Sequence, residues 1–217
     1  CASVFEPNIP AAETRVRMGP VLDGVTPFLL GQPEPRSFRV SDEPAEDVAA
    51  VLRESGAQVV VNYLPVGAQQ ATEHYARAAL EAGCALVNCI PVFIASDANW
   101  VARFAQQGLP LIGDDIKSQC GATIIHRSLV RLMEERGIAI DRMYQLNIGG
   151  NTDFLNMLQR ERLESKRESK TQSVQSQLEQ PLAGEDIHIG PSDYVPWLRD
   201  RKVCHIRIEG RGFGGAP

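Results

Sequence analysis

The order of apolar and polar positions predicts alternating helices and strands between residues 46 and 112. Two short apolar runs, residues 58–64 and 85–89, are typical of fully buried strands rather than of half-exposed ones. In chain order the pattern predicts helix 46–52, strand 58–64, helix 67–82 with Gly83 as its C-cap, strand 85–89, helix 100–107 and strand 111–112. This alternation and spacing are typical of a parallel sheet with crossover helices.

A second region begins near Asp141. It follows a predicted helix over residues 122–135 and contains predicted strands over 143–148 and 203–208. Residues 1–44, by contrast, are rich in Pro and Gly and show no sustained period, apart from a short strand expected over 15–18. We therefore predict two α/β units, preceded by a connecting segment.

Composition and charge exclude several classes of protein. Hydrophobic residues make up 43% and charged residues 23% of the chain, which excludes disordered and collagen-like proteins. The formal net charge of −5 argues against binding of nucleic acid or an anionic membrane by the whole surface. No apolar run approaches the roughly 20 residues of a membrane-spanning helix, so no membrane span is expected. Residues 1–15 show no signal peptide and the five cysteines form no disulfide framework, so we expect a cytoplasmic protein.

Some common kinds of catalytic site are not predicted. Cys84 and Cys89 are close in sequence, but an apolar strand separates them and no second Cys or His pair follows at ligand spacing. We therefore expect core cysteines and no metal. The motifs of α/β-hydrolases and of zincins are missing, which excludes both classes. His126 lies on an apolar helical face and is expected to be a satisfied core histidine.

Small and polar residues follow each predicted strand of the first sheet. They are residues 63–67, 88–91 and 113–115, and ligands bind at such strand ends in parallel sheets. Asp114 and Asp115 can orient a ribose or a nicotinamide amide or bind a cation. Alternatively, Asp115 or Ser118 only caps the next helix, and the pattern leaves these interpretations open. No Gly-x-Gly-x-x-Gly turn joins a strand to a helix, and the glycines of 210–215 lack that context, so they are expected to form a flexible tail.

The densest polar segment, residues 160–170, contains five basic and three acidic residues. If it is helical, Lys166 and Lys170 lie one turn apart on one face, where an anion such as a phosphate would relieve their repulsion. Ser165, Ser169 and Thr171 supply hydroxyl donors beside such an anion. A solvated charged face is the alternative that the charge pattern alone favours, and contact with a nucleic acid backbone is the weakest of the three.

Four segments in order resemble the myo-inositol-1-phosphate synthase family, in its shorter actinobacterial and archaeal form. They are residues 113–119, 147–156, 164–171 and 187–193, and the resemblance runs from about residue 16 to the end of the chain. It implies a partial NAD-binding, Rossmann-like domain over residues 1–140. It also implies a partial catalytic and oligomerisation domain with an open sheet over residues 141–217, and a homotetramer.

The resemblance also implies a reaction. The family converts D-glucose 6-phosphate to 1D-myo-inositol 3-phosphate with bound NAD. The substrate is oxidised at C5, C6 is enolised, C6 attacks the C1 aldehyde, and C5 is reduced again, so the net reaction is an isomerisation. Lysines suit such a site because they can bind a phosphate, exchange protons and stabilise oxyanions.

Individual residues acquire roles from the same resemblance. Three lysines match catalytic residues: Lys166, Lys170 and Lys202. Positions that match cofactor contacts are Tyr63, Leu64, Pro65, Val66, Asp115, Ser118, Asn151, Asp153 and Asp200. Lys117 and Asn156 are expected at the margin of the site, in contact with the substrate.

Parts of the family pattern are expected outside this sequence. The glycine turn for the pyrophosphate would precede Cys1, and a further strand, an Asp-Ser segment, helices and one more active-site lysine would follow Pro217. The chain by itself is therefore expected to bind NAD poorly. Two alternatives to the synthase remain open: an NAD(P)-dependent dehydrogenase of a related two-domain Rossmann group, and an inactive fragment that serves as a structural or interaction module.

Overall fold

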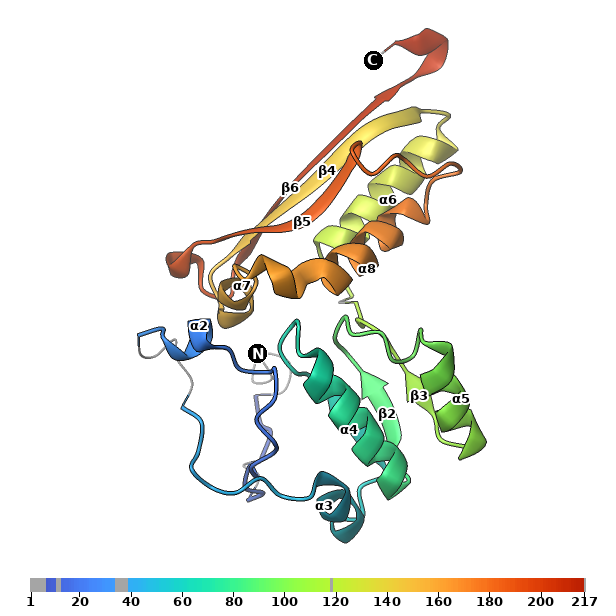
Figure 1. Ribbon diagram of the computed structural model, residues 1–217. Helices are drawn as coiled ribbons and strands as arrows, with labels where there is room; N and C mark the ends of the chain where they lie inside the picture. The colour runs from blue at the N-terminus through green and yellow to red at the C-terminus, as the bar shows by residue number, and fades with distance from the viewer. Residues whose placement is uncertain (1–6, 11–12, 34–38, 118, 217) are drawn as a thin grey trace.

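The computed structural model describes residues 7–10, 13–33, 39–117 and 119–216, apart from the side chains of residues 165, 166, 191 and 192 (Figure 1). Two three-stranded sheets organise the molecule. Sheet A has the strand order β1-β2-β3 and sheet B the order β5-β4-β6. The elements are α2 Pro27–Leu30, α3 Val48–Glu54, β1 Val59–Asn62, α4 Gln69–Ala82, β2 Ala85–Asn88, α5 Ala98–Gln106, β3 Leu111–Ile112, α6 Ala122–Glu135, β4 Ala139–Gly149, α7 Thr152–Asn156, η1 Arg160–Leu163, α8 Glu164–Gln175, β5 Ile187–Tyr194, η2 Pro196–Leu198, β6 Lys202–Arg211 and η3 Phe213–Gly215.

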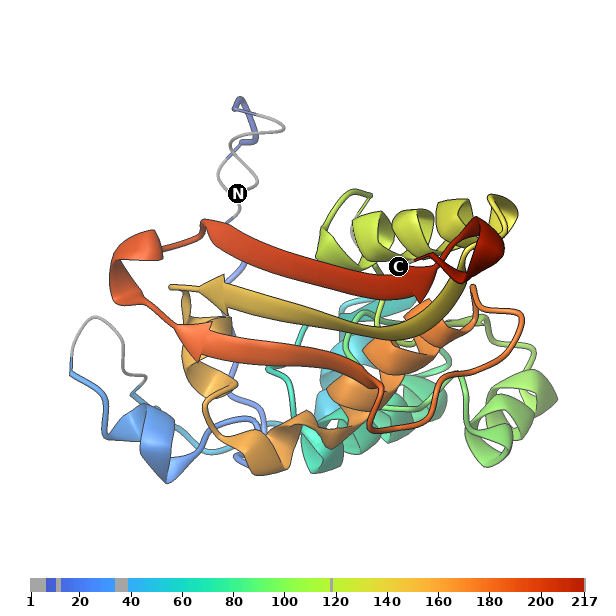
Figure 2. The same cartoon turned by 90° about the horizontal axis from the view of Figure 1, so that it is seen from above.

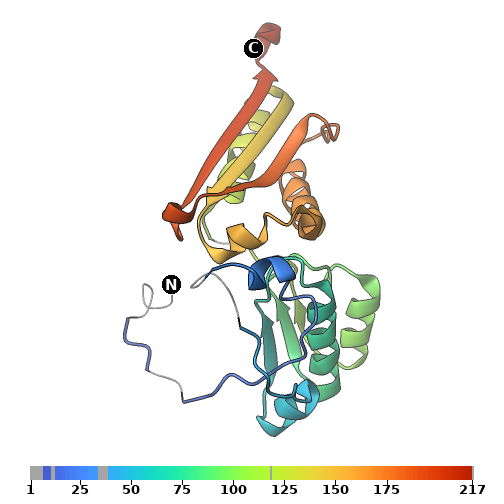
Figure 3. The same ribbon diagram turned by 60° about the vertical axis from the view of Figure 1, so that its left-hand side comes forward.

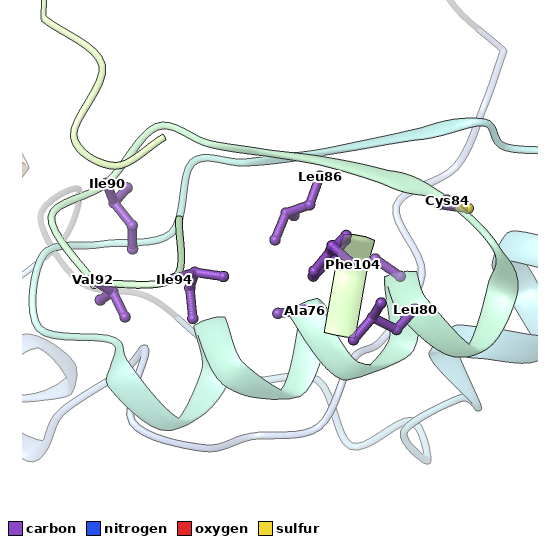
Figure 4. Packing of buried hydrophobic residues seen from close by; sticks show 9 residues of the cluster. Ala76, Leu80, Cys84, Leu86, Ile90, Val92, Ile94 and Phe104 are labelled. Carbon is purple, nitrogen blue, oxygen red and sulfur yellow. The ribbon is translucent and has the colours of Figure 1, made fainter. Parts of the chain in front are cut away.

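Sheet A is parallel throughout, which confirms the predicted crossover pattern. Its core lies on one face, where Leu86 of β2 packs with Ala76 and Leu80 of α4 and with Phe104 of α5 (Figure 4). Cys84 is fully buried in this cluster, as expected for a core cysteine. The prediction that residues 58–64 form a fully buried strand is wrong. Val59 and Val61 are 52% and 50% exposed, because the apolar cluster covers only the other face of β1.

Sheet B is mixed, since β4 pairs in parallel with β5 and antiparallel with β6. Helices α6 and α8 pack side by side against one face of it (Figure 2). The core between them contains Val130, Met143, Val174 and Ile189. The predicted α/β class is therefore confirmed. The domain boundary between residues 140 and 141 stays a prediction, and the helix just before it, α6, packs against β4.

Two predictions at the ends of the chain are wrong. Residues 15–18 form no strand. The glycine cluster does not begin as a flexible tail, because Gly210 and Arg211 end β6 and pair with Ile140 and Ala139 of β4. A Cβ added at Gly210 would lie 2.6 Å from the Ala139 carbonyl oxygen, so a glycine is required for this close approach of the two strands.

The two halves meet where α2 lies beside α7 and η1 (Figure 3). The Arg162 guanidinium donates from Nε to the Val66 carbonyl at 3.2 Å and from Nη1 to the Asp23 carbonyl at 2.8 Å. Asn156 Nδ2 donates to the same Val66 oxygen at 2.9 Å. Thr26 Oγ1 donates to Gln159 Oε1 at 2.7 Å. We call these contacts the Val66 joint.

Candidate active site

A pocket of about 390 Å³ lies at the carboxyl ends of β1 and β2, where parallel sheets bind ligands. Its walls are residues 63–66 after β1, residues 89–91 after β2, Asp115, and Asp153 and Asn156 of α7. We call it the loop pocket. The structure therefore brings together seven predicted site residues from three separate parts of the sequence: Tyr63, Leu64, Pro65, Val66, Asp115, Asp153 and Asn156.

Asn156 has an unused acceptor in the loop pocket. Its side chain is 2% exposed, and its Nδ2 is occupied by the Val66 carbonyl. Its Oδ1 is buried and has no hydrogen-bond partner among the described residues. A buried acceptor left without a partner costs about 1–3 kcal/mol, so this atom indicates a place for a donor group of a ligand.

A second pocket, of about 350 Å³, adjoins the first, and the two share Asp115 and Asp153. Three lysines line it: Lys117, Lys170 and Lys202. We call it the lysine pocket. Residues 121–124 form another part of its wall, and they include the first turn of α6, whose N-cap Gly121 supplies no side-chain hydrogen bond. The free amide groups and the dipole of this 14-residue helix add to the positive charge of the lysines.

The ammonium groups of Lys170 and Lys202 both lie close enough to the Cys204 thiol to act on its pKa. Burial raises the pKa of Cys204, while the ammonium groups of Lys202 and Lys170 act in the opposite direction. Lys202 Nζ also lies 5.7 Å from the centre of the Phe154 ring, in cation–π contact. The lysine pocket therefore suits an anionic ligand or an anion that forms during a reaction.

The adjacent carboxylates of Asp114 and Asp115 have different roles. Asp114 accepts hydrogen bonds from Asn88 Nδ2 at 2.7 Å and from the backbone amides of Ile94, Ala95 and Ser96, each at 3.0 Å. Asp114 thereby fixes the loop after β2, and its carboxylate oxygens are engaged by donors of the protein itself. Asp115, in contrast, lines both pockets. The helix-cap interpretation is wrong for Asp115, because the N-cap of α6 is Gly121.

Asn151 and Asp200 line neither of these pockets. Asn151 is the N-cap of α7, where its Oδ1 accepts from the Phe154 amide at 3.2 Å, and its Nδ2 lies 3.5 Å from Asp200 Oδ1. Asp200 belongs to a loop, residues 197–201, that lines a separate cavity. The two glycines before Asn151 allow parts of the protein itself to approach closely. A Cβ on Gly149 would lie 2.5 Å from the Phe154 ring, and one on Gly150 would lie 2.3 Å from the Val195 carbonyl oxygen and 2.5 Å from the Arg199 amide.

Two further predicted residues are only partly covered by the structure. Ser118 lies outside the described residues. Lys166 lies in α8 one turn before Lys170, which confirms the helical spacing. The side chain of Lys166 is not among those that the structure describes. The expectation that Ser169 donates to an anion is not met, since its hydroxyl donates to Asp115 Oδ2 at 2.7 Å. Among the described residues, no group of three or more His, Cys, Asp or Glu side chains has a metal-binding arrangement.

The sequence and the fold were compared with known proteins. Residues 121–217 match the family model described as Myo-inositol-1-phosphate synthase. The chain is 51% identical over 214 residues to the inositol-3-phosphate synthase of Mycolicibacterium smegmatis, and the match covers 97% of this chain and 58% of that protein. The chain belongs to the myo-inositol-1-phosphate synthase family. It spans a little over half the length of the curated relatives that it matches.

Solved structures agree with this membership of the myo-inositol-1-phosphate synthase family. A synthase-related protein from Thermotoga maritima is 28% identical with a TM-score of 0.65, over 78% of this chain and 50% of that chain. The inositol-3-phosphate synthase of Caenorhabditis elegans is 17% identical with a TM-score of 0.68, over 92% of this chain and 46% of that chain, and it supports the fold alone. In the described part of this chain, no helix is both long and apolar enough to cross a membrane.

Sequence reasoning missed several residues that line the pockets. Leu29 reaches the loop pocket from the segment before sheet A, which shows no periodic pattern that could have placed it. The sequence predicts residues 121–124 only as the start of a helix, whereas they also line the lysine pocket. The short distance in sequence between the end of β3 and this helix start could have indicated that position. Cys89 was placed in the core, whereas the structure has it in the wall of the loop pocket.

Proposed function

We propose that the protein of which this chain forms part is an inositol-3-phosphate synthase, which converts D-glucose 6-phosphate to 1D-myo-inositol 3-phosphate. The observation that carries the proposal is the pair of adjoining pockets that share Asp115 and Asp153. One pocket has the position of a nucleotide site in a parallel sheet. The other is lined by lysines, which suit a phosphorylated substrate.

The loop pocket fits one end of NAD, whose carboxamide and hydroxyl groups can donate to the unpartnered Oδ1 of Asn156. Residues 63–66 and Asp115 would hold it with Asn156. Ser118, Asn151, Asp153 and Asp200 complete the cofactor contacts that we propose from the family resemblance. NAD, when bound, supplies a hydride acceptor for C5 of the substrate and later returns the same hydride.

The lysine pocket fits the phosphate of glucose 6-phosphate. The backbone amides in the first turn of α6 can donate to phosphate oxygens, and Lys117 and Lys170 flank them with positive charge. Lys166, one turn before Lys170 on α8, is assigned to the same cluster by the family resemblance. A phosphate held at this end would direct the sugar carbons toward Asp115 and Asp153, where the two pockets meet.

The remaining chemistry is proton transfer and stabilisation of negative charge. We assign the Nζ atoms of Lys170 and Lys202 to the protons lost from the C5 hydroxyl and from C6, and to those gained by the oxygens at C1 and C5. Each proton lost is matched by one gained, so the lysines end in the protonation state in which they began. Their positive charge also stabilises the C6 enolate before it attacks C1.

The homotetramer is proposed from the family resemblance, and the apolar side chains on the face of sheet B opposite to α6 and α8 suit a contact between subunits. Leu146 is 37% exposed although its neighbours in β4, Gln145 and Asn147, are buried, so it points away from the helices. Val203 on β6 is 51% exposed and pairs with Ile148 beside it. Burial of these side chains between subunits would remove apolar surface from water.

The complete gene product that carries this sequence, incubated with NAD and D-glucose 6-phosphate, tests the proposal. We expect inositol phosphate with no net accumulation of NADH. Stoichiometric NADH without inositol phosphate would instead identify a dehydrogenase.

Replacement of Lys202 tests the assigned role of that lysine. Lys202→Ala should lower turnover by about 100-fold or more, because a proton-transfer group is lost, and should leave NAD affinity by calorimetry nearly unchanged. Arg131→Ala, on the exposed face of α6, is the matched loss of a positive charge and should not alter turnover. Near-normal formation of inositol phosphate by Lys202→Ala would remove this residue from the mechanism.

A further inference from the structure

Ser169 joins a lysine-bearing helix to the end of sheet A. Its hydroxyl donates to Asp115 Oδ2 at 2.7 Å and accepts from Lys117 Nζ at 3.0 Å. Lys117 and Asp115 also form an ion pair, so the three side chains make a closed triangle. We call it the Ser169 joint. A hydroxyl offers one donor and two acceptor positions, and this arrangement uses the donor and one acceptor.

The corners of the triangle come from different halves of the molecule. Asp115 and Lys117 follow β3 of sheet A, whereas Ser169 lies in α8, which packs against sheet B. The side chains of Asp115 and Lys117 are only 16% and 28% exposed, so solvent screens the triangle less than it would a surface pair. Such charge-assisted bonds are stronger than those between neutral groups, and they hold α8 at a defined place relative to β3.

The placement of Asp115 and Ser169 gives this contact a consequence for the reaction. Asp115 lines both pockets, and Lys170, the residue next to Ser169 in α8, lines the lysine pocket. Ser169 itself is not in the wall of either pocket, so it acts through its neighbours. We propose that Ser169 is a positioning residue, which sets the separation of Asp115 from Lys170 and so aligns the cofactor end of the site with its lysines. The inference rests on the proposed function.

Helix propensity separates this role from a contribution to folding. Alanine is a better helix former than serine, by a few tenths of a kcal/mol, so Ser169→Ala should leave α8 at least as stable. It would, however, remove the bond to Asp115 Oδ2 and leave that oxygen with Lys117 alone. Ser169→Thr keeps a hydroxyl at the same place and restores the donor.

The test compares the wild-type complete gene product with Ser169→Ala, Ser169→Thr and Ser173→Ala. Ser173 lies one turn later on α8 and is the matched loss of a hydroxyl. We expect Ser169→Ala to lower kcat on the order of 10- to 100-fold, the cost of a misplacement of about 1 Å. The KM for glucose 6-phosphate should stay within about threefold, since the phosphate contacts remain. Ser169→Thr should recover most of kcat, and Ser173→Ala should match the wild type.

Each other outcome contradicts a defined part of the reasoning. Wild-type kcat in Ser169→Ala would overturn the positioning role, and so would a Ser169→Thr protein that folds but is no more active than Ser169→Ala. A fall in melting temperature of Ser169→Ala that parallels its loss of activity would assign the residue to folding and also overturn the role. A wild-type protein that makes no inositol phosphate would contradict the proposed function and, with it, the inference that rests on it.

Discussion

His126 begins a ladder of buried polar groups between α6 and sheet B. Its Nδ1 lies 3.2 Å from Gln145 Oε1, Gln145 Nε2 donates to Asn147 Oδ1 at 3.0 Å, and Asn147 Nδ2 donates to the Gly190 carbonyl at 2.6 Å. Only an amide NH₂ can donate to that carbonyl, so the orientation of each side chain follows from the next. His126 therefore carries its proton on Nδ1. Its core position confirms the prediction, but its Nε2 is buried without a partner among the described residues, so it is only half satisfied.

This histidine should make stability depend on pH. Burial lowers the pKa of His126, and the bond to Gln145 offsets only part of the shift. The unfolded chain then binds a proton at a higher pH than the folded chain. The stability contributed by the neutral ring is complete above the ordinary histidine pKa of about 6.5 and is lost as the pH falls from there toward the lowered pKa.

Urea unfolding at two pH values, one on each side of the ordinary histidine pKa, checks this expectation. As the pH is lowered, the free energy of unfolding should decrease more steeply in the wild type than in His126→Met, whose side chain does not titrate. Exposed His188 offers the control, since His188→Gln should keep the wild-type dependence. Equal slopes for all three proteins would show that His126 takes up its proton in the folded state as readily as in the unfolded one.

The two adjacent carboxylates should respond differently to the same substitution. In the wild type, both carboxylate oxygens of Asp114 accept hydrogen bonds from backbone amides. Asp114→Asn replaces one of these oxygens with an NH₂ group, which cannot accept, so the free energy of unfolding should fall by about 1–3 kcal/mol in denaturant unfolding. Asp115→Asn keeps an oxygen acceptor for Ser169 but loses the charge that pairs with Lys117, so it should cost less stability than Asp114→Asn, and it should weaken NAD binding, because Asp115 lines the loop pocket. Each variant is the control for the other. NAD affinity unchanged in Asp115→Asn by calorimetry would contradict its role at the cofactor.

At the level of elements, α4 takes its N-terminal cap from a distant part of the chain. Its own N-cap, Ala68, forms no side-chain hydrogen bond. Instead Asp23 accepts from the Gln70 and Ala71 amides at 2.7 and 2.9 Å. A carboxylate at this position also interacts favourably with the helix dipole. The segment before sheet A is thereby attached to the core of the first half.

Asp23→Ala should cost about 1 kcal/mol of unfolding free energy, in the range of 0.5–2 kcal/mol for a lost N-cap. Asp42→Ala, at an exposed position of the same connecting region, should change stability little. Chemical denaturation of the two variants measures the difference. Equal stabilities would mean that water satisfies the first amides of α4 as well as Asp23 does.

The elements show where pattern-based prediction succeeds and where it fails. Helices α4 and α6 were predicted to within about one turn, because an apolar stripe and a glycine at the C-terminal end mark each of them. Strand β5 was missed as a strand. It contains Gly190, Pro191 and Ser192, which are unfavourable in a strand interior, and it is tolerated because it lies at the edge of sheet B.

At the scale of the whole molecule, the candidate site could be predicted only in part. Four sequence segments indicated the family, and they contain part of the wall of both pockets, including Asp115, Asp153 and Lys170. The contacts that join the halves could not be predicted. Arg162 meets the Val66 carbonyl and Ser169 meets Asp115 across 96 and 54 residues, and neither pair leaves a periodic signal in the sequence. Such pairs are decided by packing, which no local pattern describes.

The two joints differ in how they constrain evolution. In the Val66 joint, Arg162 and Asn156 donate to the backbone carbonyl of residue 66, which every amino acid provides, so these two bonds do not depend on the side chain at position 66. The Ser169 joint has a side chain at every corner, so a change at one corner leaves a charge or a hydroxyl without its partner. We therefore expect positions 115, 117 and 169 to be retained as a set. A recombination event between residues 117 and 169 of two divergent relatives would separate that set, whereas one before residue 115 would keep it intact.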